Sequence, residues 1–221
     1  MILRDYQQRA IDDLYSWFGS NVGNPCLVLP TGAGKSLIIA ALCRDAIQQW
    51  PETRILMMSH VKELIEQNAE KMRAMWPGAP LGIYSASLRK RNLEEPITFA
   101  GIQSVRNKSK EIGHVDLVII DECHLVNHKA EGGYRTLIEE LTTINPELRV
   151  IGLTATPHRL GHGLITDKPA IFDDLLESVT IEELIHKGYL ANLRSKVTKE
   201  KLSTDGVHKR GGDFIESELQ S

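Results

Sequence analysis

The stretch "CLVLPTGAGKSLIIAALCRDAIQQW" (26–50) combines a short apolar strand, a glycine turn and an amphipathic helix. The strand stops at Pro30, and the apolar residues after Lys35 follow the i, i+3, i+4, i+7, i+8 spacing of a helix packed on a sheet: Ile39, Leu42, Cys43, Ala46 and Ile47. A strand, turn and helix in this order point backbone N–H groups and a helix N-terminus at phosphate. We therefore expect Lys35 to reach the outer phosphates of a nucleotide and the Ser36 hydroxyl to ligate Mg²⁺.

The candidate phosphate-binding residues are the whole turn: Pro30, Thr31, Gly32, Ala33, Gly34, Lys35 and Ser36. The strict spacing GxxxxGK[ST] has a glycine where this chain has Leu29. The alternative interpretation is a glycine turn that simply begins an ordinary helix. A second motif later in the chain favours the phosphate loop.

That second motif, "VDLVIIDECH" (115–124), ends an apolar strand with two adjacent carboxylates. Two carboxylates at a buried strand end are costly unless a cation or a reaction needs them. We expect Asp121 to join the Mg²⁺ shell through water, and Glu122 to orient and deprotonate the attacking water. The alternative is a solvated acidic pair with no chemical role.

Apolar strands and amphipathic helices alternate along the chain. The expected strands are 26–29, 54–59, 81–85, 96–101, 115–121 and 149–155, and the expected helices are 5–18, 35–50, 61–76 and 134–144. Such strands are typical of an α/β fold, a parallel sheet covered by helices on both faces. Ligands bind at the carboxyl ends of these strands. Five candidate loops fall at that edge: 31–36, 59–60, 101–104, 121–124 and 154–156.

The charge balance limits the kind of partner. The 221 residues include 26 basic and 29 acidic residues, for a formal net charge of -3. Nucleic-acid binding must then rest on a local patch rather than on a global basic field. The one dense basic cluster inside the domain, "LRKR" (88–91), fits a solvated turn between two strands or a contact to phosphates.

Cysteine usage and apolar run lengths indicate the compartment. Three widely spaced cysteines without a CxxC pair argue against a disulfide framework and fit a reducing compartment. A zinc site is not favoured either, because Cys123, His124 and His128 lack a convincing ligand spacing. The amino terminus carries charges too early for a signal peptide, and no apolar run approaches ~20 residues. We expect a cytoplasmic protein with no membrane contact.

In chain order, "PTGAGKS" (30–36), "DECH" (121–124) and "TAT" (154–156) resemble motifs I, II and III of superfamily-two helicases of the DExH type. The proline-threonine form of the loop accounts for Leu29. "LRDYQ" (3–7) resembles the adenine-recognising element, "SHVKEL" (59–64) motif Ia and "GIQS" (101–104) motif Ib. The match covers roughly residues 1–190 and implies a RecA-like P-loop domain that uses ATP and Mg²⁺. Finer details look most like RadD-type DNA-repair ATPases and the restriction-enzyme and XPB-like branch.

The resemblance implies roles for residues outside the phosphate loop. Gln7 would read the adenine edge with paired hydrogen bonds, and Arg4 would stack on or near the base. Four residues would couple the nucleotide state to the grip on nucleic acid: His124, Thr154, Ala155 and Thr156. Three would hold a nucleic-acid strand: Ser59, Gln103 and Ser104. Each of the two serines could instead cap the helix that follows it. Arg159 is a further candidate without a fixed role.

The resemblance also implies a boundary near residue 195. Residues 1–195 would form one RecA-like lobe, and 196–221 a linker and the start of a second lobe. No QxxGRxxR-like element, which carries the arginines of the second lobe, occurs in the sequence. We therefore expect ATP–Mg²⁺ binding with weak hydrolysis by this chain. The expected function is a nucleic-acid-dependent ATPase, with DNA preferred over RNA. The alternatives are an RNA helicase lobe, a nucleotide-binding or interaction module without turnover, and another P-loop enzyme such as a kinase, which the TAT motif disfavours.

Overall fold

A computed structural model describes residues 2–126, 132–159, 163–168, 170–192, 209–210 and 213–214. Seven helices occur in the described part of the chain: α1 (Asp5–Ser20), α2 (Lys35–Gln49), α3 (Lys62–Met75), α4 (Ile102–Val105), α5 (Ser109–Ile112), α6 (Gly133–Ile144) and α7 (Ile181–His186). A single 3-10 turn, η1 (Cys123–Leu125), follows the acidic pair. The proposed linker at 196–221 lies outside the described residues, except for the two short strands near the end of the chain.

One eight-stranded sheet organises the molecule. Its strands, in spatial order, are β10 (Asp174–Leu176), β1 (Pro25–Val28), β7 (Arg149–Thr154), β6 (Leu117–Asp121), β2 (Ile55–Ser59), β5 (Ile97–Gly101), β3 (Leu81–Ser85) and β4 (Lys90–Arg91). Every neighbouring pair is parallel except β3 with β4. Two antiparallel pairs stand apart from this sheet: β8 (His158–Arg159) with β9 (Gly163–Leu164), and β11 (Lys209–Arg210) with β12 (Asp213–Phe214). The predicted parallel sheet is therefore confirmed.

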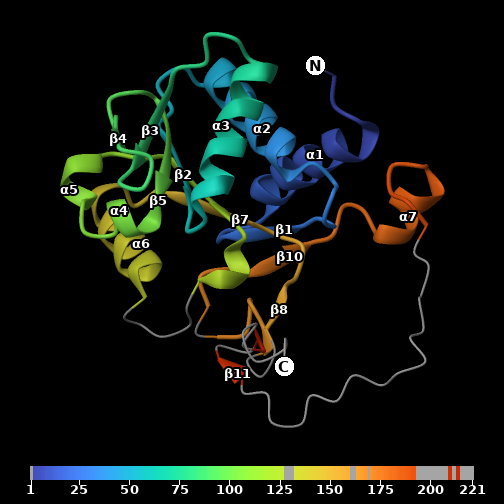
Figure 1. Cartoon of the computed structure of the whole chain (residues 1–221). Helices are drawn as coiled ribbons and strands as arrows, with labels where there is room; N and C mark the ends of the chain where they lie inside the picture. Colours follow the sequence, from blue (N-terminus) through green and yellow to red (C-terminus); the bar gives the residue numbers. More distant parts are fainter. Residues whose placement is uncertain are drawn as a thin grey trace, which may run out of the picture.

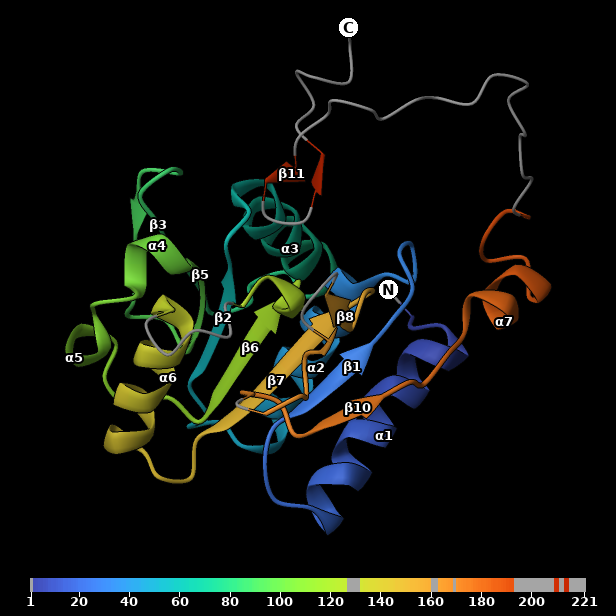
Figure 2. The ribbon, with the colours of Figure 1, turned by 90° about the horizontal axis from the view of Figure 1, so that it is seen from below.

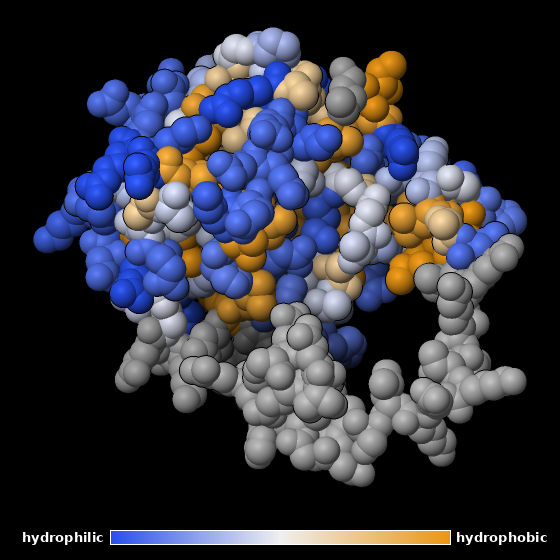
Figure 3. Space-filling model, viewed as in Figure 1, coloured by the Kyte–Doolittle hydropathy of each residue, from blue (hydrophilic) through white to orange (hydrophobic). Residues whose placement is uncertain are grey.

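Helices cover both faces of this sheet, as the unbroken apolar strands predict (Figures 1 and 2). Alternate residues of one strand point to opposite faces, so Met57 packs with α1, α2 and α3, while Met58 packs with α4, α5 and α6. Both methionines are fully buried. Polar side chains dominate the outer surface of the helices, and apolar surface gathers around α7 at the right of Figure 3.

Space for the packing depends on one glycine in the middle of β7. A Cβ on Gly152 would come within 2.7 Å of the Phe172 ring and 2.8 Å of the Cys123 sulfur. Cys26 and Cys123 place their sulfur atoms 3.4 Å apart beside this position. The three cysteines are buried free thiols, in line with the sequence argument against a disulfide framework.

The sequence pattern missed the short elements. β10 pairs in parallel with β1 at one edge of the sheet, but its three residues begin with a charged side chain and give no periodic signal. At the other edge, the basic cluster 88–91 divides between a turn, with Arg89 at φ +53°, and the exposed strand β4. Charged residues on an edge strand discourage pairing with another chain. This placement favours the solvated interpretation of the cluster.

Candidate nucleotide site

The phosphate loop joins β1 to α2 at the carboxyl edge of the sheet. Two of its glycines have φ +83°, a conformation that residues with a side chain rarely adopt, and α2 begins directly after the second one, at Lys35. The Leu29 N–H donates to the Thr154 carbonyl at 2.9 Å and so ties the loop to the end of β7. The N-terminus of α2 therefore opens onto the loop, the arrangement that favours a bound phosphate.

A continuous chain of polar contacts connects the three motifs predicted from the sequence. Lys35 Nζ lies 3.3 Å from Glu122 Oε1, and His124 Nδ1 lies 3.3 Å from the other oxygen, Oε2. The same His124 nitrogen lies 2.9 Å from Thr154 Oγ1, and this hydroxyl oxygen accepts from the Thr156 N–H at 3.0 Å. The structure thus brings residues from three distant parts of the sequence, from Lys35 to Thr156, into one network.

The two adjacent carboxylates occupy opposite environments. The His124 contact, followed by Lys35, holds the pKa of Glu122 below its ordinary value and keeps the group ionised. Asp121 is 3% exposed, and burial raises the pKa of its carboxyl, although the Asn68 hydrogen bond opposes this shift. Adjacent carboxylates with separated pKa values suit separate roles.

Glu122 and Arg89 are the two described residues other than glycine that have a positive φ, and only Glu122 lies at the candidate site. It has φ +49° and ψ +49°, the left-handed region, at the point where β6 passes into η1. For a residue with a side chain this conformation costs about 1–3 kcal/mol, and such strain clusters at functional sites. In this conformation the Glu122 carboxylate lies 3.3 Å from Lys35 Nζ. The strain therefore supports a specific task for this carboxylate.

Asn68 of α3 supports Asp121 and was not expected from the sequence. Its Nδ2 donates to Asp121 Oδ2 at 2.9 Å, while the Glu122 N–H donates to Oδ1 at 3.0 Å. The Asn68 Oδ1 atom is buried and has no hydrogen-bond partner among the described residues. The one signal in the sequence was a polar asparagine on the expected apolar face of this helix. Asn68 lies 53 residues from Asp121, so nothing in the sequence indicated this contact.

The donor set fits a Mg²⁺ ion held with the help of water. Each Asp121 oxygen accepts one hydrogen bond and keeps further acceptor capacity, and the unsatisfied Asn68 Oδ1 can accept from a water of the ion's shell. Ser36, in the first turn of α2, would supply a hydroxyl ligand to such an ion. No cluster of three or more His, Cys, Asp or Glu side chains suited to a resident metal occurs in the described ranges. His128 lies outside those ranges.

The adenine-reading candidate Gln7 is built into the base of the phosphate loop. It is 2% exposed, its Oε1 accepts from the Arg4 N–H at 3.0 Å, and its Nε2 donates to the Ala33 carbonyl at 3.0 Å. The Tyr6 hydroxyl donates to the same carbonyl at 2.9 Å. A Cβ at Gly34 would come within 2.6 Å of Gln7 Nε2, so the loop needs a glycine there. Gln7 and Tyr6 thus hold the loop from behind.

The three nucleic-acid candidates lie at the ends of β2 and β5, and two of them use their hydroxyls inside the protein. Ser59 is fully buried, and its Oγ accepts from the Val61 N–H at 3.2 Å, just before α3 begins. The Ser104 hydroxyl accepts from the Ala86 N–H at 2.9 Å. Gln103 is exposed. The burial of Ser59 favours the turn-building interpretation for that residue.

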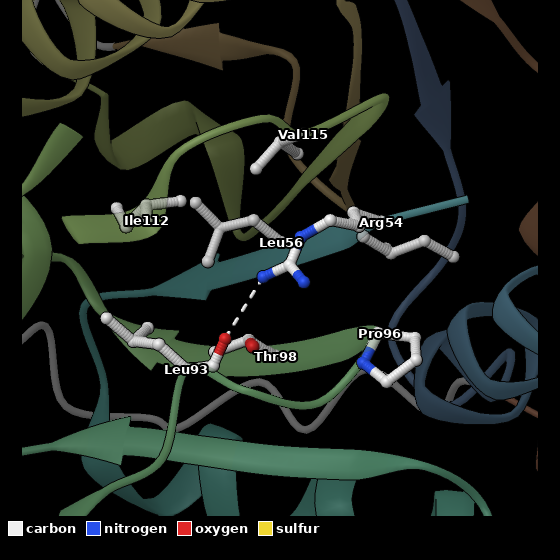
Figure 4. A pocket seen from close by; sticks show the side chains of 8 residues that line it. Arg54, Leu56, Leu93, Pro96, Thr98, Ile112 and Val115 are labelled. Carbon is white, nitrogen blue, oxygen red and sulfur yellow. Dashed lines mark hydrogen bonds between the residues drawn. The ribbon is translucent and has the colours of Figure 1, made fainter. Parts of the chain in front are cut away.

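Two hollows lined by described residues lie at the opposite, amino end of the sheet. The small cavity in Figure 4 has a volume of about 10 Å³, which is the space of one water molecule, and lies at the amino ends of β2 and β5. The Arg54 guanidinium closes it by donating to the Leu93 carbonyl at 3.0 Å. Among the described helices, none combines the length and apolarity needed to cross a membrane.

Comparison with known families gives a match over residues 1–159 to the model named type III restriction enzyme, res subunit. Across the full length, the chain is 25% identical to the putative ATP-dependent helicase IRC3 of Saccharomyces cerevisiae, of which it covers 32%. Over 61% of its length it is 31% identical to the putative ATP-dependent DNA helicase fml2 of Schizosaccharomyces pombe, of which it covers 18%. The chain thus spans a third or less of these two relatives.

Solved structures agree on the fold. A crystal structure of T4 UvsW matches 81% of this chain and 35% of its own, with a TM-score of 0.63 and 23% identity. The helicase domain of Hef from Pyrococcus furiosus matches 88% of this chain and 43% of its own, with a TM-score of 0.62 and 22% identity. The described sheet is therefore the RecA-like fold that the motifs imply.

Proposed function

The chain belongs to the family of the type III restriction enzyme res subunit, and we propose that it forms the ATP-binding lobe of a motor that hydrolyses ATP to move on or remodel DNA. Its relatives are helicases, and the RecA-like sheet is that of the first lobe of superfamily two. The observation that carries the proposal is the contact chain Lys35–Glu122–His124–Thr154. It joins the phosphate loop, the acidic pair and the loop after β7 at a single edge.

The network suggests how nucleotide entry starts the reaction. Lys35 is held by Glu122 at 3.3 Å and stands at the end of the loop that a triphosphate would occupy, where α2 begins. When it turns to the phosphate oxygens, Glu122 loses one partner and keeps His124 on its other oxygen. The freed oxygen can then accept a proton from the attacking water. Mg²⁺ held by Ser36 and Asp121 would neutralise charge on the transferred phosphate.

The same network offers a path from the nucleotide to the nucleic-acid grip. His124 contacts both Glu122 and Thr154, so a shift of the carboxylate changes the hydrogen bonding of the loop that begins at Thr154. Thr156 follows in that loop, with its N–H on the Thr154 hydroxyl. Coupling by these residues is part of the proposal.

DNA is the proposed nucleic acid because fml2, at 31% identity, is named a DNA helicase. A second RecA-like lobe is the proposed source of the arginines that complete catalysis. Arginines of this kind contribute ~10³ to 10⁵ in rate. The described residues form one such lobe, so we expect the 221-residue chain to bind ATP–Mg²⁺ and to hydrolyse it only at a background rate.

The test is nucleotide binding and ATP turnover by this chain, alone and with single-stranded DNA, duplex DNA or RNA. The expected result is binding of Mg²⁺–ATP with background turnover in every case, and retained binding in Glu122→Gln. Failure to bind nucleotide would overturn the proposal. Loss of binding in Glu122→Gln would mean that the roles of the two carboxylates are misassigned. Strong stimulation by RNA alone would contradict the preference for DNA, and stimulation by any nucleic acid would contradict the need for a second lobe.

A further inference from the structure

The turn after α7 reverses the chain toward the start of α1. The N–H groups of Tyr189 and Leu190 both donate to the Leu184 carbonyl, at 2.8 and 3.1 Å, and Gly188 between them and the helix has φ +72°. A left-handed glycine that follows a helix in this way ends it and redirects the next residues. Leu184 is fully buried and anchors α7 in the main core, the apolar cluster to which α1, α2 and α3 contribute.

Ion pairs hold this turn against the first helix. The Arg9 guanidinium donates to both Glu183 oxygens at 2.8 Å, and its Nε donates to the Ser178 carbonyl at 2.9 Å. Lys187 Nζ lies 2.5 Å from Asp5 Oδ2 and 3.0 Å from Glu183. A single exposed pair would do little, but a bidentate arginine within a network fixes geometry. The turn is therefore held in place relative to α1. Arg4 is the N-cap residue of that helix, and Gln7 lies in its first turn.

The turn places two side chains against the expected nucleotide site. The Tyr189 ring centroid lies 4.3 Å from the Arg4 guanidinium carbon and 5.4 Å from the Tyr6 ring. Leu190 reaches the phosphate loop, because a Cβ on Gly32 would lie only 2.9 Å from its Cδ2 atom. Figure 2 shows α7 beside the amino-terminal end of α1, on the side of the sheet where the N-terminus lies.

We propose that Tyr189 is a positioning residue for the base end of the nucleotide site, which holds the Arg4 guanidinium flat as a shelf for adenine. This inference rests on the proposed function and extends it to residues far outside the phosphate loop. The Arg4 guanidinium carbon lies over the Tyr189 ring, 4.3 Å from its centroid. A guanidinium plane has two faces, so a base would stack on the face turned away from Tyr189. Arg4 is exposed, and its guanidinium also donates a long hydrogen bond, 3.4 Å, to the Tyr6 hydroxyl. Without Tyr189, more of the order of this long side chain would have to be gained when the nucleotide binds.

Leu190 acts on the neighbouring part of the same site. It lies over Gly32, where the loop turns toward the phosphates, and it belongs to the apolar packing of the main core. Its contact couples the position of the α7 turn to the conformation of the loop. Base recognition therefore involves both ends of the described lobe, residues 3–7 and residues 184–190.

The test compares ligands with and without a base. Wild type, Tyr189→Ala, Tyr189→Phe and Tyr189→Leu are titrated with Mg²⁺–ATP and with inorganic tripolyphosphate in a calorimeter. Tyr189→Ala and Tyr189→Leu should weaken ATP binding about fivefold, the size expected from losing an exposed cation–π contact, and leave tripolyphosphate unchanged. Tyr189→Phe keeps the ring face and should match wild type with both ligands.

A double-mutant cycle separates positioning from packing. Since Tyr189 acts through Arg4, Tyr189→Ala should have no further effect on ATP affinity in an Arg4→Ala background. Equal weakening of both ligands, no weakening of either, tighter ATP binding, or full additivity with Arg4→Ala would each overturn the inference. Lys35→Ala should weaken both ligands. If the wild-type chain binds ATP no more tightly than tripolyphosphate, the adenine shelf alone is contradicted. If it binds neither ligand, the proposed function is overturned and the shelf with it.

Discussion

Two halves of the same sheet edge use their polar residues in different ways. At the ends of β1, β7 and β6, the side chains of Lys35 and His124 each contact Glu122, both at 3.3 Å. At the ends of β2 and β5, the Ser59 and Ser104 hydroxyls accept from backbone N–H groups of nearby loops. The first half contains groups that can exchange partners when a ligand arrives. The second half contains hydroxyls that build the loops themselves.

The difference shows what a motif does and does not reveal. Both halves were found from the sequence by their place after an apolar strand, and both lie where such loops were expected. The position of a strand end is fixed by chain order and the parallel topology. Whether a hydroxyl faces outward or closes a turn depends on local backbone geometry, which the motif does not encode.

Lys35→Ala should produce the largest change and would test whether the first half is a nucleotide site. It removes the cation expected to bond phosphate, and a hydrogen bond to a charged group contributes about 1.5–3 kcal/mol. We expect Mg²⁺–ATP affinity to fall by about 10- to 100-fold, measured by calorimetry. Lys90→Ala, an exposed lysine of β4, is the matched control and should bind as wild type does. Equal affinities for the two variants would contradict a nucleotide site in the first half.

Asn68→Ala should have the next largest effect, through Asp121. The variant removes the amide that donates to Asp121 Oδ2, and replacing a group that orients a metal ligand costs about 10- to 100-fold in metal affinity. We expect the Mg²⁺ concentration for half-maximal ATP binding to rise about 10-fold, with little change in the metal-free affinity. Asn92→Ala is the control, since its side chain accepts only from the Glu94 N–H at the exposed edge. An unchanged Mg²⁺ requirement would place the ion elsewhere.

The sequence predicted the long elements and the location of the site. Strands such as 117–121 and helices such as α2 have apolar spacing that leaves few alternatives, and the loop, the acidic pair and the TAT residues lie at adjacent strand ends. Asn68 and Tyr189 could not be found in this way. Their roles arise from contacts across 53 and 185 residues of chain, with Asp121 and Arg4, and neither belongs to a local pattern.

The conformation of Glu122 was equally out of reach of the sequence. Its φ of +49° is not a conformation that glutamate prefers, so local propensity argues against it. The surrounding contacts with Lys35 and His124 select it. The sequence could therefore indicate a general base at this position but not the turn that directs its side chain to the phosphate loop.

The pH dependence of stability should separate wild type from Glu122→Gln. The folded pKa of Glu122 is lowered by His124 and Lys35, so its stabilising contribution is present above the ordinary value of 4.5 and is lost as the pH falls through the lower folded value. We expect Glu122→Gln to be about 1 kcal/mol less stable at pH 7 in urea unfolding, because contacts to a charged acceptor are weakened. The difference should shrink below pH 4.5. A difference that stays constant between pH 7 and pH 4 would mean that Glu122 is not ionised within this network.

The smallest effects should come from the second half of the edge. Ser59→Ala leaves the Val61 N–H without its acceptor, and a hydrogen bond of this kind contributes about 0.5–1.5 kcal/mol. The melting temperature should fall by about 2–4 °C per kcal/mol for a domain of this size. Ser104→Ala should cost less, since water can reach the exposed Ala86 N–H and replace the lost acceptor. If both serines build loops, the more buried Ser59 should lose more stability on replacement than Ser104. Binding of a labelled oligonucleotide should stay unchanged in Ser59→Ala. If Ser59→Ala instead weakened that binding at an unchanged melting temperature, the buried hydroxyl would have to be released to contact a strand, and the second half of the edge would resemble the first.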